Sequence, residues 1–180
     1  MQKEHNTGKK LERAVAGAYR KMGAWKVERD IVQAEWLLGA AWVALAENRD
    51  KTALTEAERH LTDALTRCHR INLVEFESDI LLAWARWYHV RDDVAQARRY
   101  ADDALAIADR CEYRLKQADI HNFLARLDLE SNQRDPAGAH AQTAYDRAWC
   151  DGPPHCYKPA LDQARRLLTQ LGLQPPSPPC

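Results

Sequence analysis

The sequence predicts an all-α fold, a right-handed solenoid of antiparallel helix pairs. We expect about three repeats, with a partial repeat before them and a capping helix after them. The first observation is a stripe of small residues that recurs at one fixed interval along the chain. The second is that no proline precedes Pro136, as expected of a chain that is helical almost throughout. The stripe consists of Ala57, Leu61, Ala64 and Leu65, then Ala97, Ala101, Ala104 and Leu105, then Ala137, Ala141, Ala144 and Tyr145.

The stripe belongs to the second helix of each predicted pair, and Gln96–Cys111 is the central example. Positions i, i+4, i+7 and i+8 lie on one face of a helix. Small side chains on that face let a neighbouring helix approach to the short end of the usual interaxial range of about 8–10 Å. A helix pair of this kind cannot bury both of its faces alone. Successive pairs are therefore expected to stack on one another.

The first helix of each predicted pair is larger and more aromatic. Each carries a bulky residue followed by Gly or Ala near its middle: Leu38-Gly39 in Ala34–Glu47, Leu82-Ala83 in Ser78–Val90 and Leu124-Ala125 in Ala118–Glu130. Bulky and small residues on this helix, facing small residues on the next, favour an antiparallel pair.

The predicted repeat domain covers residues 9–172. Residues 1–8 are polar and are expected to be a flexible N-terminus, and the Pro-rich segment 173–180 is expected to be a disordered tail. Residues 9–22 have apolar side chains at helical spacing and would form the second helix of the partial repeat. That partial repeat is either a cap or the end of a longer array.

The last two predicted helices lie on either side of a strong break. Asp135-Pro136 begins the first of them, since a proline in the first turn costs no helical hydrogen bond. That helix should end near Cys150, because the following Asp151-Gly152-Pro153-Pro154 breaks a helix strongly. Lys158–Leu171 is amphipathic and suits a cap on an open stack. Its outward polar residues are predicted to be Asp162, Gln163, Arg165 and Arg166.

Composition and charge argue against several classes of protein. The chain of 180 residues has 26 basic and 26 acidic residues, a balance that predicts neither a nucleic-acid partner nor an anionic membrane surface. No apolar run approaches the roughly 20 residues needed to cross a bilayer, and the first residues lack the apolar core of a signal peptide. We expect a cytoplasmic protein.

The repeat pattern resembles the tetratricopeptide repeat. The residues that carry the resemblance are Trp36, Leu38-Gly39 and Trp42 with Ala57, Leu61 and Ala64; Leu82-Ala83 and Trp87 with Ala97, Ala101 and Ala104; and Leu124-Ala125 with Ala137, Ala141 and Ala144. The interval between stripes is longer than the roughly 34 residues of a usual repeat, so helices or loops must be longer. The proline that closes a repeat is absent after the first two. Other paired-helix repeats fit the same pattern.

The segment that follows the last stripe adds a second resemblance. Cys150 to Pro154, followed by Tyr157, Leu161 and Leu167-Leu168, is similar to the end of the repeat regions attached to bacterial STAND-type signalling ATPases. The resemblance implies a detached sensor tail, whose partner could be a larger signalling ATPase or a defence assembly. The chain has no Gly-x-x-x-x-Gly-Lys phosphate loop, so no ATPase activity and no cofactor are expected.

In repeats of this kind the first helices line the concave face, which makes their non-core residues the candidate partner-binding residues. Trp and Arg often dominate the energetics of interfaces. Trp84 and Trp87 also have the spacing of a core stripe, so the sequence leaves core packing open for them. The predicted residues are Trp84, Trp87, Tyr88 and Arg91 in one cluster and Asn122, Arg126 and Glu130 in the next.

The predicted function is a non-catalytic interaction, sensor or scaffold module that binds a protein or peptide through the concave face. A clamp for an acidic carboxyl tail needs several Lys and Asn residues on successive first helices, and only Asn122 and Arg126 suit it. A more apolar helix or extended segment fits better. The alternatives are a regulator that responds to a peptide or a small molecule, and purely structural self-association.

Two further hypotheses concern chemistry. Helical ribonucleases resembling the HEPN family use an arginine followed after four to six residues by a histidine, and Arg114 with His121 and Arg134 with His140 match on spacing. The polar residue that usually follows the arginine is matched only weakly, by Asp135 after Arg134, and that pair lies at a predicted helix start. An enzyme is not predicted. Cys150, His155 and Cys156, with His140, could hold a metal ion, but the spacing of the two cysteines fits no usual zinc motif. We therefore predict no metal site.

Overall fold

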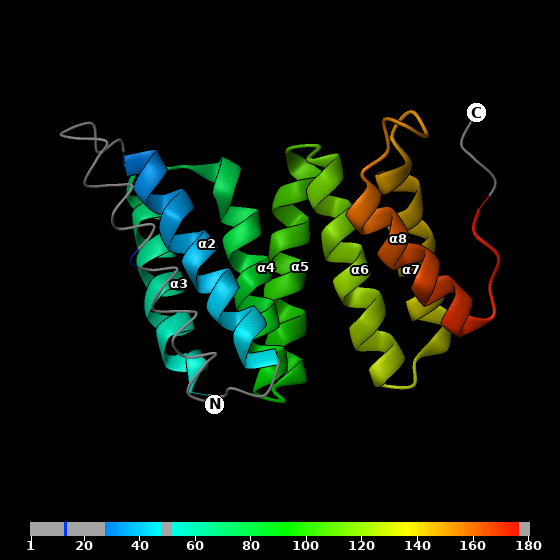
Figure 1. The fold of residues 1–180 in the computed structure, drawn as a ribbon, viewed down its shortest axis with the longest axis horizontal. Coiled ribbons are helices and arrows are strands. Elements are labelled where there is room, and N and C mark those ends of the chain that lie inside the picture. Colours follow the sequence, from blue (N-terminus) through cyan, green and yellow to red (C-terminus); the bar gives the residue numbers. More distant parts are fainter. Residues whose placement is uncertain (1–12, 14–27, 48–51, 177–180) are drawn as a thin grey trace. The chain divides into compact units, whose positions relative to one another are not determined.

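The computed structural model describes residues 13, 28–47 and 52–176 (Figure 1). These residues form helices and turns, with no strand among them. The helices are α2 (Glu28–Glu47), α3 (Ala53–Arg70), α4 (Val74–Val90), α5 (Val94–Arg110), α6 (Arg114–Glu130), α7 (Arg134–Trp149) and α8 (Lys158–Leu171). The predicted all-α helical repeat class is therefore confirmed.

The chain divides into two compact units, residues 1–100 and 101–180, and the division falls inside α5. In the first unit α2 packs against α3, and α4 packs against both. Its core joins Val32, Trp42 and Val43 of α2 to residues of the other two helices. Those partners are Ala57, Leu61 and Ala64 of α3 and Phe76, Ile80 and Trp87 of α4.

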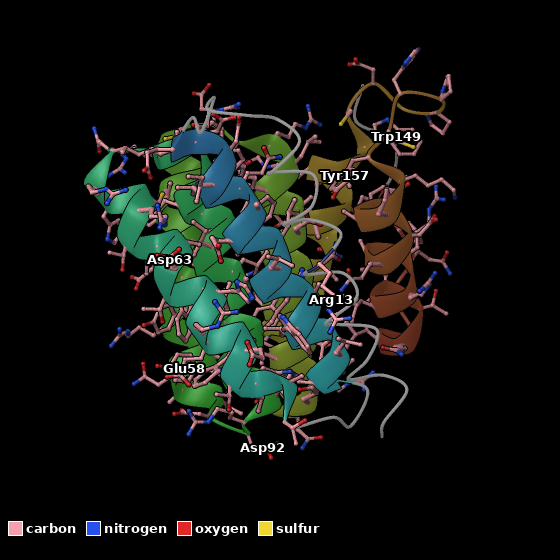
Figure 2. The ribbon with its side chains drawn as sticks, turned by 60° about the vertical axis from the view of Figure 1, so that its left-hand side comes forward. Arg13, Glu58, Asp63, Asp92, Trp149 and Tyr157 are labelled. Carbon is pink, nitrogen blue, oxygen red and sulfur yellow. The ribbon has the colours of Figure 1, made fainter. Side chains whose placement is uncertain are left out.

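In the second unit α7 packs against α6 and α8, which also contact each other. Ala125, Ala141 and Leu161 lie in its core. Trp149, at the end of α7, and Tyr157, just before α8, lie towards the same end of the unit and pack against this core (Figure 2). The backbone N–H of Tyr157 donates to the carbonyl oxygen of Ala148 at 2.8 Å, which ties the loop between α7 and α8 to the helix it leaves.

The first three positions of the predicted stripe are buried in all three helices, and the fourth is partly buried at Leu65 and Leu105. Nine of its positions have no exposed surface: Ala57, Leu61 and Ala64 in α3, Ala97, Ala101 and Ala104 in α5, and Ala137, Ala141 and Ala144 in α7. The bulky–small dipeptides of the first helices do not keep a common register. Leu82 is the ninth residue of α4 and Leu124 the eleventh of α6, although both helices have 17 residues. The small-residue stripe therefore carries the repeat, and the dipeptide does not.

One turn geometry joins most of the helices. Asn72, Asp92, Glu112 and Asn132 are evenly spaced in the sequence and all have φ between 53° and 62°. The residue after each donates its backbone N–H to the carbonyl oxygen five residues earlier, as Leu73 does to Cys68 at 2.9 Å. This is the Schellman arrangement that ends a helix with a left-handed residue. The turns are only three residues long, so the extra length of each repeat lies in the helices.

The predictions for both ends of the chain lie largely outside the described residues. Of residues 1–27, the structure describes Arg13 alone, so the flexible N-terminus and the partial repeat stay predictions. α8 has the bounds predicted for the last helix, Lys158–Leu171, and residues 173–176 are not helical. Residues 177–180 of the predicted tail are not described. Within the described ranges, no helix combines the length and apolar character needed to span a bilayer.

Candidate functional site

A groove in the second unit contains two of the predicted partner-binding residues. We call it the α6–α8 groove. Its volume is 330 Å³. Arg126, Leu129 and Glu130 line it from α6, and Gln163, Arg166, Leu167 and Gln170 line it from α8. Positions three and four residues apart lie on one face of a helix, so each helix presents a single stripe to the groove.

The groove combines an apolar centre with polar, positively charged walls. Leu129 is partly buried and Leu167 is 7% exposed, whereas Arg166 and Glu130 are exposed. Two guanidinium groups and one carboxylate leave one net positive charge among the lining residues. The guanidinium carbon of Arg126 lies 5.3 Å from the centre of the Phe123 ring, which orients this partly buried side chain. The arrangement can accept an apolar side chain together with a carboxylate.

Asn122, the remaining predicted residue on α6, lies in the core and not in the groove. It has no exposed surface, and its side-chain Nδ2 donates to the carbonyl oxygen of Ala160 at 2.9 Å. Its Oδ1 is buried without a hydrogen bond among the described residues. Asn122 therefore links α6 to the first turn of α8, and burial leaves it no surface for a partner. Asn122 and Arg126 are four residues apart on one face of the helix, so the sequence alone could not distinguish the core residue from the groove residue.

Trp84, Trp87 and Tyr88 of α4 form an aromatic cluster in the first unit with Tyr100 of α5, and Arg91 follows directly after α4. Trp84 is 8% exposed and Trp87 is 3% exposed, which makes both mainly core residues. The Trp87 indole N–H donates to the carbonyl oxygen of Leu54 at 2.9 Å. The Arg91 guanidinium lies 4.5 Å from the Trp87 ring centre. Both tryptophans thus lie mainly in the core, which is the alternative that the sequence left open. Their role in binding stays a prediction.

Tyr88 is the residue of this aromatic cluster whose pKa is shifted. Its ring stacks on that of Tyr100 with 5.1 Å between centres. Burial raises the pKa of Tyr88, and the neighbouring Tyr100 raises it further. The hydroxyl therefore stays protonated at physiological pH and can only exchange hydrogen bonds. These properties suit a packing role and not acid–base catalysis.

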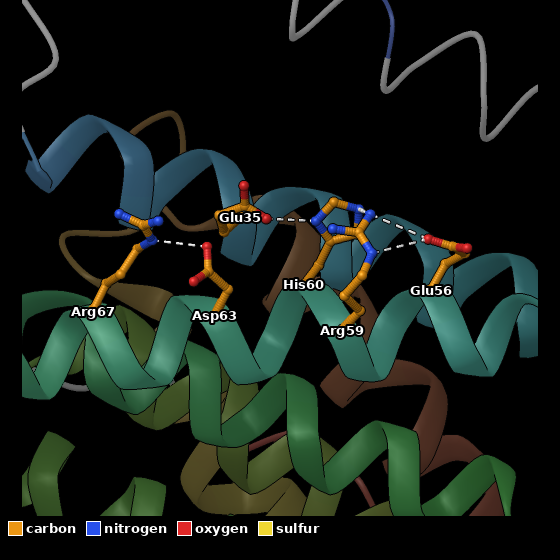
Figure 3. A network of polar contacts seen from close by, with 6 residues as sticks. All are labelled: Glu35, Glu56, Arg59, His60, Asp63 and Arg67. Carbon is orange, nitrogen blue, oxygen red and sulfur yellow. Dashed lines mark hydrogen bonds and ion pairs between the residues drawn. The ribbon is translucent and has the colours of Figure 1, made fainter.

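A polar network joins α2 to α3 on the first unit (Figure 3). His60 is 4% exposed, and its Nδ1 lies 2.5 Å from a carboxylate oxygen of Glu35. Its Nε2 lies 2.8 Å from a guanidinium nitrogen of Arg59. Because arginine can only donate, Nε2 must accept and Nδ1 must carry the proton that is donated to Glu35. Both ring nitrogens are engaged, so we assign His60 a structural role.

The two histidines of the proposed ribonuclease motifs lie side by side in the second unit. The Nδ1 atoms of His121 and His140 are 2.9 Å apart. His121 and Arg114 also line one 560 Å³ pocket. The Arg114 guanidinium, however, donates to the carbonyl oxygens of Arg147 at 3.0 Å and Asp146 at 2.9 Å. Arg134, the other candidate, donates to the carbonyl oxygen of Leu171 at 3.1 Å. Both arginines thus stabilise helix ends.

The cysteine-containing loop between α7 and α8 gives no metal centre within the described residues. No group of three or more His, Cys, Asp or Glu side chains that could hold a metal ion occurs there. Cys150 and Cys156 are free thiols and are partly exposed. The Cys150 sulfur contacts the carbonyl oxygen of Arg147 at 3.8 Å.

Comparison with known proteins identifies no relative: no protein-family model, no curated protein and no solved structure matches the chain. Sequence reasoning missed the contribution of α8, because it read Gln163 and Arg166 as the solvated face of a cap. The signal that could have found it is the spacing of Gln163, Arg166, Leu167 and Gln170, which puts them on one face beside the apolar stripe.

Proposed function

We propose that the protein is a non-catalytic interaction module that binds a partner protein or peptide in the α6–α8 groove. The observation that carries the proposal is the pairing of Arg126 and Glu130 with Arg166 and two glutamines around a leucine-lined centre. Arginine side chains beside desolvated apolar surface are typical of binding hot spots. The expected ligand is an extended or helical segment with an apolar anchor residue and at least one carboxylate.

The chemistry of the groove supports this ligand class. Leu129 and Leu167 offer apolar contact to the anchor. Arg126 and Arg166 can each form a bidentate, charge-assisted bond with a carboxylate. Gln163 and Gln170 are seven residues apart, two turns of α8, and can hydrogen-bond the backbone of a bound segment. A basic ligand would meet the two guanidinium groups and be repelled.

The sequence resemblances suggest a setting for this binding. A tetratricopeptide-like array, similar to the repeat regions of bacterial STAND-type ATPases, would act as a cytoplasmic sensor or scaffold. Its partner would then be a protein of a signalling or defence assembly. This setting rests on the residues that carry the resemblance and is a finer proposal than the groove itself.

The test is selection of ligands from a displayed library of random peptides. We expect enrichment of peptides that combine Asp or Glu with a large aliphatic residue. Fluorescence polarisation with one selected peptide should then show at least a tenfold loss of affinity for Arg126→Glu and for Arg166→Glu, since each reversal replaces an attractive charge with a repulsive one.

Arg165→Glu is the matched control. Arg165 neighbours Arg166 on α8 and is exposed, but it lies outside the groove, 5.8 Å from the Tyr145 ring. Its reversal changes the net charge equally and should leave the affinity within about twofold, since the side chain lies against Tyr145 and cannot contact a ligand in the groove, and salt weakens the remaining effect of an exposed charge. Equal losses in all three variants, or a library that enriches basic peptides, would contradict the proposal.

A further inference from the structure

The two histidines that join α6 to α7 form a hydrogen bond in a head-on geometry. Their Nδ1 atoms are 2.9 Å apart and their ring centres are 5.1 Å apart. The separation of the ring centres exceeds that of the nitrogens by about twice the distance from the centre of an imidazole ring to one of its atoms. Both Nδ1 atoms therefore lie near the line that joins the two ring centres. Two lone pairs that met in this way would repel each other. One Nδ1 must therefore carry a proton and the other must accept it.

A buried carboxylate favours one direction of this hydrogen bond. Asp128 is 1% exposed, and its Oδ2 lies 3.8 Å from Nε2 of His140. The negative charge favours a proton on that Nε2, which leaves Nδ1 of His140 as the acceptor. His121 then donates from its Nδ1, and its own Nε2 carries the lone pair. Among the described residues, this Nε2 makes no hydrogen bond. It is also not one of the buried side-chain atoms that lack a partner.

Charged groups of both signs surround the pair. Asp109 at the end of α5 and Glu112 in the next turn line the pocket beside His121, as do Arg114 of α6 and Arg147 of α7. Towards α8, Asp119 accepts a hydrogen bond from the Tyr157 hydroxyl at 3.0 Å. Burial lowers the pKa of His121 to about 4, and His140 and Arg147 lower it against the opposing effect of Asp109. His121 is therefore neutral at physiological pH.

We propose that His121 and His140 act as an acid-sensitive latch between α6 and α7, which stays closed at neutral pH and opens when the pair takes up protons. One proton can enter at Nε2 of His121 while the Nδ1–H···Nδ1 bond remains. A second proton has to occupy Nδ1 of His140, where it faces the proton on His121. The bond then breaks and the two like-charged rings separate.

The latch bears on the α6–α8 groove through α6, and this consequence rests on the proposed function. Arg126, Leu129 and Glu130 line the groove on the helix that carries His121, which lies just over one turn before Arg126. Loosening α6 from α7 displaces the groove wall. Acid should therefore weaken peptide binding by more than the titration of the peptide's own carboxylate does.

The direction of the pH effect follows from the sign of the pKa shift. The pKa of His121 lies lower in the folded protein than the ordinary value of 6.5. The stability that depends on neutral His121 is thus complete above pH 6.5 and is lost as the pH falls towards 4. Between pH 7.5 and 5.5, this group alone should reduce the folding equilibrium constant about five- to tenfold, where the lower figure allows for its partial exposure to solvent.

The experiment compares urea unfolding at pH 7.5 and pH 5.5 for wild type, His121→Gln and His140→Gln. The matched control is His155→Gln, since His155 is exposed in the loop of the same unit. We expect His121→Gln to lose most of the five- to tenfold pH effect and His140→Gln to lose a smaller part, because the burial of His121 remains in that variant. The control should keep the whole effect. The same pH effect in wild type and His121→Gln would overturn the proposal.

Nitrogen-15 NMR of the histidine rings in the wild-type protein keeps the test independent of variant folding. At pH 7.5 it should show a proton on Nδ1 of His121 and on Nε2 of His140. A His121 titration midpoint near the ordinary value, or the opposite tautomers, would overturn the latch.

Binding of the selected peptide at pH 7.5 and at pH 4 separates the latch from the groove. At pH 4, which is near the pKa of His121 in the folded protein, wild type should lose more affinity than His121→Gln, whose loss reports the titration of the peptide's own carboxylate. Arg126→Glu should lose binding without altering the pH effect on unfolding. A peptide that binds elsewhere would count against the groove but leave the unfolding and NMR results to decide the latch. Affinity that falls equally in wild type and His121→Gln would refute the coupling of latch to groove.

Discussion

The close contact of Gly39 with Leu61 predicts that Gly39→Ala destabilises the wild-type protein but stabilises the Leu61→Ala variant. A Cβ atom at Gly39 would lie 2.6 Å from both Cγ and Cδ2 of Leu61 and 3.2 Å from its backbone nitrogen. Leu61 has no exposed surface, so its side chain cannot swing into solvent. The two later residues of the same stripe position, Ala101 and Ala141, are alanines. The bulk of Leu61 is thus matched by the absence of a side chain at Gly39.

The magnitude follows from two competing effects. Replacing glycine by alanine within a helix stabilises by up to about 1 kcal/mol. Overpacking a tight core costs about 1–3 kcal/mol. Gly39→Ala should therefore destabilise the protein by about 1–2 kcal/mol. Leu61→Ala alone should cost about 2–5 kcal/mol, since it leaves a cavity. With Leu61→Ala already present, both close carbon contacts are gone, and Gly39→Ala should instead stabilise by about 0.5–1 kcal/mol.

A double-mutant cycle measured by urea unfolding provides the assay, with helicity followed by circular dichroism. The interaction free energy between the two sites should exceed about 1 kcal/mol. Gly138→Ala in α7 is the control, because a Cβ there would meet only Cδ1 of Leu173, at 2.9 Å. Leu173 is 38% exposed and can move aside, so this change should stabilise. Additive effects, or a stabilising Gly39→Ala in the wild-type background, would refute the reasoning.

Three single substitutions test other features. Glu112→Gly should stabilise by about 0.5–1 kcal/mol in urea unfolding, since Glu112 has φ 54° and its Cβ is strained there; no gain would contradict the strain. Asn122→Asp should cost at least about 3 kcal/mol at pH 8 and less at pH 5, because it sets a buried carboxylate against the Ala160 carbonyl oxygen; an equal cost at both pH values would count against a buried charge. Tyr157→Phe should lower the thermal midpoint, with a loss of about 1–2 kcal/mol from its 3.0 Å bond to Asp119.

The fold could be predicted from the sequence because its strongest signal is purely steric. Where one helix must approach another closely, the contact positions are small residues such as Ala97 and Ala137. This steric requirement can be read from the residues on one face of each helix. The absence of proline before Pro136 then indicated the helical content. The dipeptides such as Leu82-Ala83 failed as repeat markers because several positions on a first helix are buried, so a bulky and a small residue can pack in more than one register.

The candidate site could be predicted only in part, because facing residues come from helices far apart in the sequence. Arg126 and Glu130 were found from their helix alone, whereas Arg166 becomes a groove residue only through the packing of α8 beside α6. Asn122 has the same helical face as Arg126 in projection, but its amide reaches the backbone at Ala160. The approach of His121 to His140 depends on the register between α6 and α7, which no spacing within either helix specifies.

The two periods of the chain have separate physical origins. Left-handed residues recur at a constant interval from Asn72 to Asn132, so the backbone repeats once per helix and turn. The side chains repeat over twice that interval, since only alternate helices carry the small stripe. Asn and Asp tolerate the left-handed conformation without glycine, which makes the shorter period hard to see in the sequence. Glu112 lacks that tolerance, and it occupies this position in the turn beside the pocket that reaches His121. Among these four turns, the one before α6 is therefore the one in which the backbone is most strained.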